Sequence, residues 1–239
     1  QGMKSFHEWP REIMERRPDA LEAAARSLKK EIHYHIFVQY LFFRQWEALH
    51  RYANEKGIHI IGDMPIYMAP DSADAWTERD LLDPQGRVAG CPPDYFSETG
   101  QLWGNPLYDW DALRKTGYAW WVRRIAHQMS MCDHLRVDHF RAFESYYAIP
   151  AGAKTAVTGE WLPGPGIDFF RKLKDALGDL PLIAEDLGYL TPGVFELLHA
   201  TGFPGLKVLQ FAFAPDGSSS YLPHRYEKNC LVYTGTHDN

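Results

Sequence analysis

The chain alternates short apolar runs with longer amphipathic stretches, the pattern of strands and helices that follow one another. Parallel strands are buried on both faces and therefore read as near-continuous apolar segments. Five runs fit this description, and each is bounded by polar, glycine or proline residues. The predicted strands are 58–61, 133–138, 182–185, 206–211 and 231–235.

Helical spacing joins these runs. Residues 20–56 predict a long helix with Asp19 as its N-cap, and the loose apolar spacing allows a break within it. Shorter helices are predicted at 117–131 and 167–177, the second ending at Gly178, and at 192–200, where Thr191-Pro192 has the form of a helix start. Strands that alternate with helices favour an α/β fold with a parallel sheet.

Residues 64–115 break this alternation. They contain six prolines, with glycine and aromatic residues between them, and show no sustained periodicity. We predict a lid-like, loop-rich insertion after the first strand, with short helices near 72–76 and 110–114. Loops of this length inside a compact domain are usually functional. A second Gly/Pro-rich loop is predicted at 150–166.

Three predicted strands end in acidic residues. Asp138 follows LRV, Glu185 follows LIA, and Asp238 lies just beyond LVYTG, while Asp63 follows the strand at 58–61 after Gly62. Catalytic groups of α/β barrels lie at the C-terminal ends of the strands. Carboxylates from three strands at one rim would stabilise positive charge in a transition state, as sugar cleavage requires.

Acetal cleavage by a retaining enzyme needs a carboxylic acid that protonates the leaving oxygen and an ionised carboxylate that attacks the anomeric carbon. Arg136 lies two residues before Asp138, on the same face of the strand, and a guanidinium there would hold the carboxylate ionised. Glu185 emerges from an apolar strand, where desolvation raises a carboxyl pKa, as a general acid requires. Salt-bridged carboxylates at strand ends are the structural alternative.

A hydrolytic zinc site is a second alternative, because imidazole and carboxylate groups are zinc ligands. The sequence has neither a helical HExxH pair nor a cysteine cluster, so we expect no metal and no organic cofactor. The residues that would form such a site are His134, Asp138, His139, His237 and Asp238.

Composition narrows the classes of partner. The 239 residues suit one large domain, and a formal net charge of −6 without a basic stripe disfavours nucleic acid or an anionic membrane surface. No apolar stretch approaches the roughly 20 residues of a membrane span. Three widely spaced cysteines form no disulfide framework, so we expect a cytoplasmic protein.

Several strings together resemble the 4-α-glucanotransferase family (amylomaltase or disproportionating enzyme, glycoside hydrolase family 77). The resemblance covers residues 57–239 closely and residues 1–56 more loosely. The strings are IIGDMPIYMAPDSADAW, PPDYFSETGQLWGNPLYDW, LRVDHFRAFESYYAIPAG, IAEDLGYLTPGV and YTGTHDN.

The resemblance implies a (β/α)8 barrel of the α-amylase clan that transfers α-1,4-glucan segments between maltodextrins by a retaining double displacement. Only about strands 3–7 of such a barrel are expected in this chain, so residues 1–239 are expected to be part of one catalytic domain, with 64–115 as the insertion. The implied partners are a maltooligosaccharide donor and a glucose or maltodextrin acceptor. A clan hydrolase with water as acceptor and a non-catalytic glucan-binding relative are the alternatives.

The resemblance also assigns roles to residues. Asp138 is implied as the nucleophile, Glu185 as the acid/base and Asp238 as the stabiliser of the transition state. The stretch 94–105 is implied as an aromatic loop over the acceptor side. The implied substrate-binding residues are Arg136, His237, Asp63, Asp94, Tyr95, Phe96, Trp103 and Asn105.

Overall fold

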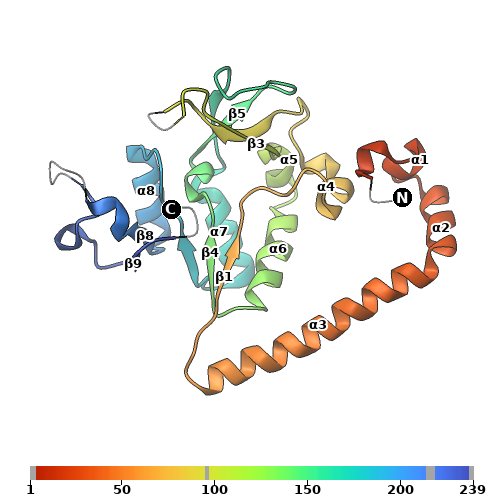
Figure 1. The fold of residues 1–239 in the computed structure, drawn as a ribbon, viewed down its shortest axis with the longest axis horizontal. Helices are drawn as coiled ribbons and strands as arrows, with labels where there is room; N and C mark the ends of the chain where they lie inside the picture. Colours follow the sequence, from red (N-terminus) through yellow and green to blue (C-terminus); the bar gives the residue numbers. More distant parts are fainter. Residues whose placement is uncertain (1–3, 95–96, 214–218, 237–239) are drawn as a thin grey trace.

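The computed structural model describes residues 4–94, 97–213 and 219–236. Its centre is a parallel sheet of three strands in the order β1-β4-β7, flanked by a second parallel pair, β8 and β9 (Figure 1). The amide of Ala184 donates to the carbonyl of Pro204 over 2.9 Å, so the pair β8–β9 continues from the edge of β7. The strands are β1 (Ile61–Met64), β4 (His134–Val137), β7 (Leu182–Ala184), β8 (Gly205–Val208) and β9 (Cys230–Tyr233).

Three amphipathic helices cover the outer face of this sheet. α6 packs against β1 and β4, and α7 lies between α6 and α8. The helices are α6 (Ala119–Met129), α7 (Gly166–Leu177) and α8 (Pro192–Thr201). Gly178 caps the end of α7 and Thr191 stands at the N-cap of α8, as the sequence predicts.

An aromatic core lies between the helices and the segment that follows β4. The ring of Phe169 packs on Phe143 at 4.9 Å between centroids and on Trp121 at 5.3 Å. All three side chains are fully buried. Phe143 belongs to a short 3-10 helix, η3 (Phe140–Phe143), so this core fixes the backbone immediately after Asp138.

A four-stranded antiparallel sheet, not expected from the sequence, stands beside the parallel one (Figure 1). Two of its strands lie in the predicted insertion and one in the loop predicted at 150–166. A Cβ at Gly90 would collide with the backbone oxygen of Gln101, so β2 and β3 pair closely only because a glycine stands there. The sheet has the order β3-β2-β5-β6, and its strands are β2 (Val88–Cys91), β3 (Gln101–Pro106), β5 (Ser145–Ile149) and β6 (Glu160–Pro163).

The N-terminal region is helical and largely exposed. The predicted helix over 20–56 is two helices, α2 (Pro18–Ser27) and α3 (Lys29–Glu55), that meet at Leu28. Asp19 is not the N-cap: α2 begins at Pro18, because proline needs no N–H partner at the first helical position, and Asp19 lies in the first turn. α3 extends away from the sheet and leaves many large apolar side chains exposed (Figure 1).

Two strand boundaries also differ from the prediction. The strand expected at 58–61 spans Ile61–Met64, because its ladder with β4 begins at the pair Ile61 and His134. The strand expected at 206–211 ends at Val208, and the chain continues as a 3-10 helix. The short helices predicted near 72–76 and 110–114 are present. The remaining helices are η1 (Phe6–Glu8), α1 (Arg11–Met14), α4 (Ala73–Thr77), η2 (Arg79–Leu81), α5 (Trp110–Lys115), η4 (Leu209–Ala212) and η5 (Pro223–Arg225).

None of the helices in the described part of the chain combines the length and apolar character needed to cross a membrane.

Candidate active site

The C-terminal ends of β1, β4 and β7 lie at one edge of the parallel sheet. Asp63 lies within β1, Asp138 directly follows β4, and Glu185 directly follows β7. The ladder pairs Asp63 with Arg136, and Arg136 with Ile183. Because parallel strands in this register end together, acids that are about 50 or more residues apart in sequence come to the same rim.

Arg136 joins two of these acids. Its Nη1 lies 2.7 Å from Oδ1 of Asp63, and its Nη2 lies 2.9 Å from Oδ1 of Asp138. The side chain of Arg136 is 15% exposed and that of Asp138 is 41% exposed. A largely buried guanidinium therefore orients the Asp138 carboxylate and leaves much of that carboxylate accessible from the cavity.

Glu185 has a different environment. It is 8% exposed, and its Oε2 accepts from the backbone N–H of His139 at 2.7 Å, while Oε1 accepts from the N–H of Leu187 at 2.9 Å. Burial raises the pKa of the Glu185 carboxyl, these two N–H groups partly oppose that shift, and the negative charge of Asp138 adds to it. A carboxyl that keeps its proton to higher pH is suited to act as a general acid.

His139 connects the two acids. It has a left-handed backbone conformation with φ of 53°, which turns the chain after Asp138 and aims its N–H at Glu185. Its ring meets Trp103 edge-on, with 4.8 Å between centroids. Burial lowers the pKa of the imidazole to about 4, and the nearby charge of Arg141 adds to the shift, so the ring is neutral at neutral pH.

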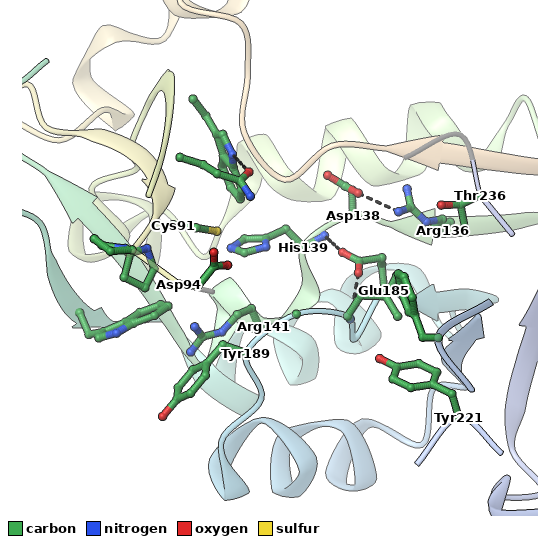
Figure 2. A pocket seen from close by; sticks show the side chains of 18 residues that line it. Cys91, Asp94, Arg136, Asp138, His139, Arg141, Glu185, Tyr189, Tyr221 and Thr236 are labelled. Atoms are coloured by element: carbon green, nitrogen blue, oxygen red, sulfur yellow. Dashed lines mark hydrogen bonds and ion pairs between the residues drawn. The ribbon is translucent and has the colours of Figure 1, made fainter. Parts of the chain in front are cut away.

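These groups line a cavity of about 930 Å³ (Figure 2). Asp138, Glu185, His139 and Arg136 form part of its wall, and the wall continues over the antiparallel sheet and the segment after β7. The other lining residues are Cys91, Pro92, Pro93, Asp94, Gln101, Trp103, Arg141, Trp161, Leu187, Gly188, Tyr189, Phe211, Tyr221 and Thr236.

The structure brings most of the sequence-predicted residues to this cavity. Asp94 and Trp103 line it, and Asp63 reaches it through the ion pair with Arg136. The side-chain amide of Asn105 instead donates to the carbonyl of Met68 at 2.9 Å. Four residues assigned from the sequence lie outside the described ranges: Tyr95, Phe96, His237 and Asp238.

Several lining residues were not predicted to bind substrate. His139 and Arg141 lie in the same string as Asp138, DHFRAF, and their proximity to Asp138 is the signal that could have identified them. Tyr189 lies four residues after Glu185 in the string IAEDLGYLTPGV, which is a signal of the same kind, whereas Trp161 lies in a stretch that the sequence predicts to be a loop. The place of Trp161 in the site depends on the pairing of β5 with β6.

Over residues 4–94, 97–213 and 219–236, no group of three or more His, Cys, Asp or Glu side chains is arranged to hold a metal ion.

The chain is similar to known proteins over nearly all of its length. Curated 4-alpha-glucanotransferases from Clostridium butyricum and from Synechocystis sp. are 51% and 52% identical to the chain over 242 residues. Each alignment covers 98% of this chain, but 50% and 48% of those proteins, so the chain spans about half the length of the curated relatives it matches.

A solved structure, an amylomaltase from Streptococcus agalactiae in complex with acarbose, matches with a TM-score of 0.96 and 45% identity. The match covers 100% of this chain and 50% of the amylomaltase chain. The five parallel strands are thus part of a (β/α)8 barrel, as predicted. A family model described as 4-alpha-glucanotransferase matches residues 1–239. The chain belongs to the 4-α-glucanotransferase family, glycoside hydrolase family 77.

Proposed function

We propose that the protein containing this chain is a 4-α-glucanotransferase that moves α-1,4-glucan segments from a maltodextrin donor to a glucose or maltodextrin acceptor. The observation that carries the proposal is the contrast between two carboxyl groups at one rim. Asp138 is accessible and paired with Arg136, whereas Glu185 is buried and its pKa is raised.

The two environments suit the two steps of a double displacement. In the first step Glu185 gives its proton to the glycosidic oxygen, the bond from that oxygen to C1 breaks, and a carboxylate oxygen of Asp138 bonds to C1. In the second step Glu185 takes the proton from a hydroxyl of the acceptor, whose oxygen bonds to C1 while the bond to Asp138 breaks. Both carboxyl groups return to their starting states.

Asp238 and His237 complete the proposal through the family motif THDN. Asp238 would stabilise the positive charge that develops at C1, and His237 would contact the sugar at the cleaved bond. Thr236, directly before them, lines the cavity. Aromatic residues such as Trp103 and Phe211 supply faces on which sugar rings stack, and excluding water favours a sugar hydroxyl as the second nucleophile.

The test is disproportionation of maltotriose by the full polypeptide that carries this sequence. We expect glucose together with products longer than maltotriose, and no net rise in reducing ends. Asp138→Asn should abolish product formation and retain glucan binding. Net hydrolysis without longer products would replace the transferase with a hydrolase that uses water. Full activity of Asp138→Asn would refute the assignment of the nucleophile.

We also propose a cytoplasmic location. All three cysteines (Cys91, Cys132 and Cys230) are free thiols, and Cys132 is buried. Unpaired cysteines are typical of a reducing compartment. Cell fractionation with detection of the native protein tests this, and recovery from the medium or an oxidising compartment would contradict it.

A further inference from the structure

One end of the cavity holds a group of residues to which the proposed chemistry gives no role. Figure 2 shows Arg141 and Tyr189 at this end, on the other side of His139 from Asp138 and Arg136. With Trp161, these two side chains come from three separate segments: η3, β6 and the loop after β7.

Arg141 is the unusual member. It is 3% exposed, and its Nη2 donates to the hydroxyl of Ser145 at 2.8 Å. Its Nε and Nη1 are also buried and have no hydrogen-bond partner among the residues described. Leaving buried donors of a charged group without a partner costs free energy. A ligand oxygen that accepts a hydrogen bond from them is therefore favoured. The guanidinium therefore leaves donor capacity at the cavity wall.

Trp161 and Tyr189 supply apolar surface beside it. The central carbon of the Arg141 guanidinium lies 3.8 Å from the Trp161 ring centroid, and Tyr147, the partner of Trp161 across the β5–β6 ladder, packs edge-on at 5.2 Å. These contacts hold Trp161 in place although it is 38% exposed. The Tyr189 ring, 69% exposed, is stacked within 25° of the same plane at 6.4 Å between centroids.

We propose that Trp161 and Tyr189, supported by Arg141, form a further glucan subsite that binds one glucose ring of the maltodextrin away from the cleaved bond. Glucose rings present an apolar face of C–H groups that packs on aromatic rings, and a rim of hydroxyls that accept from donors such as Nε and Nη1. An immobilised aromatic side chain also binds with little loss of conformational entropy. The inference rests on the proposed function, because it takes an α-1,4-glucan as the ligand.

A subsite remote from the reacting bond acts only on chains long enough to reach it. We therefore expect Tyr189→Ala to raise KM for maltoheptaose by about threefold to tenfold, the size of a lost aromatic contact, relative to KM for maltotriose. The ratio of the two KM values should return to that of the unmodified protein in Tyr189→Phe, which keeps the ring. Val157→Ala is the control, since Val157 is an exposed apolar residue before β6 that does not line the cavity.

Binding is measured separately from turnover. In the Asp138→Asn background of the full polypeptide, maltoheptaose should change tryptophan fluorescence. Trp161→Phe should reduce that change, and the remainder should come from Trp103, which lines the same cavity. Tyr189→Ala should weaken maltoheptaose binding by the same factor as it raises KM.

The two proposals fail in different ways. If transfer occurs but Tyr189→Ala alters the KM values for maltotriose and maltoheptaose equally or not at all, the subsite is refuted and the transferase stands. If no transfer occurs but maltoheptaose binds in a Tyr189-dependent manner, the subsite stands and the transferase is refuted. If maltoheptaose binding is unaffected by both Tyr189→Ala and Trp161→Phe, the subsite is refuted whatever the activity.

Discussion

The backbone N–H of His139 donates to Oε2 of Glu185 over 2.7 Å, so the residue after the proposed nucleophile holds the proposed acid/base. The bond crosses from the end of β4 to the end of β7. Its length does not depend on any side chain other than that of Glu185, because the donor is backbone. The position of the carboxyl is therefore set by the turn at His139, whose φ is 53°.

Replacing Glu185 with glutamine should separate the two steps of the reaction. With maltotriose we expect a rate loss of about 10²–10⁴-fold, because the leaving oxygen no longer receives a proton. With α-glucosyl fluoride the first step needs no acid, so Glu185→Gln should release about one equivalent of fluoride per site quickly and then slow, since the acceptor is no longer deprotonated. Asp138→Asn should give no burst. Equal losses with both donors would contradict the role of Glu185.

The pH dependence of kcat/KM should fall on the alkaline side at a pH above the ordinary pKa of a glutamic acid. Glu185 must be protonated to act, and burial together with the charge of Asp138 raises its pKa, so activity is lost as pH rises through that value. The positive charge of Arg136 lowers this pKa. In Arg136→Met the residual activity should therefore extend to higher pH. An alkaline limb that moves to lower pH would show that another group controls it.

The carboxylate of Asp133, at the N-terminal end of β4, should contribute to the free energy of unfolding. Asp133, just before β4, accepts from the N–H of Ile60 at 2.7 Å and from the side-chain amide of Asn54 at 3.0 Å. Asp133→Ala leaves these donors unpaired and should lower the free energy of unfolding by about 1–3 kcal/mol at pH 7. Asp179→Ala, on an exposed surface, should stay within about 0.5 kcal/mol.

The same variant should show a characteristic acid response. The hydrogen bond from Ile60 is the main cause that lowers the pKa of Asp133 to about 2. Its contribution is present above the unfolded-state pKa of about 4 and is lost as pH falls through about 2. The difference between the unmodified protein and Asp133→Ala, measured by urea denaturation, should therefore shrink over this window. A difference that persists unchanged at pH 2 would contradict the assignment.

Residues 1–239 expressed alone should associate with concentration. α3 exposes large apolar side chains around much of its surface, including Phe37 and Phe42, and contiguous apolar surface of this kind promotes association. The double variant Phe37→Glu/Phe42→Glu should shift light scattering and gel filtration towards monomer. Lys30→Glu, a charge change on the same helix, should not. A monomeric unmodified chain at high concentration would contradict the expectation.

Local features of the sequence were enough to predict the parallel strands and the helices that cover them. The run LIA is apolar and the run LRV is apolar apart from Arg136. Both are short and each is followed by an acid, so the burial of the two strands is predictable from composition alone. Gly178 ends α7 and Pro192 begins α8, because each residue favours the backbone conformation needed at that position. Because the C-terminal ends of parallel strands lie at one edge of a sheet, these runs are enough to predict that Asp138 and Glu185 share a rim.

The antiparallel sheet and the far end of the cavity were decided by tertiary structure. β2 pairs with β5 through Val88 and Ile149, 61 positions apart, and neither strand shows an alternating pattern because both lie against other parts of the fold. The position of Trp161 follows from that sheet, and its contact with Arg141 from the turn after Asp138. Such long-range pairings depend on which surfaces are buried together. The residues within and beside each strand do not determine which distant strand becomes its partner.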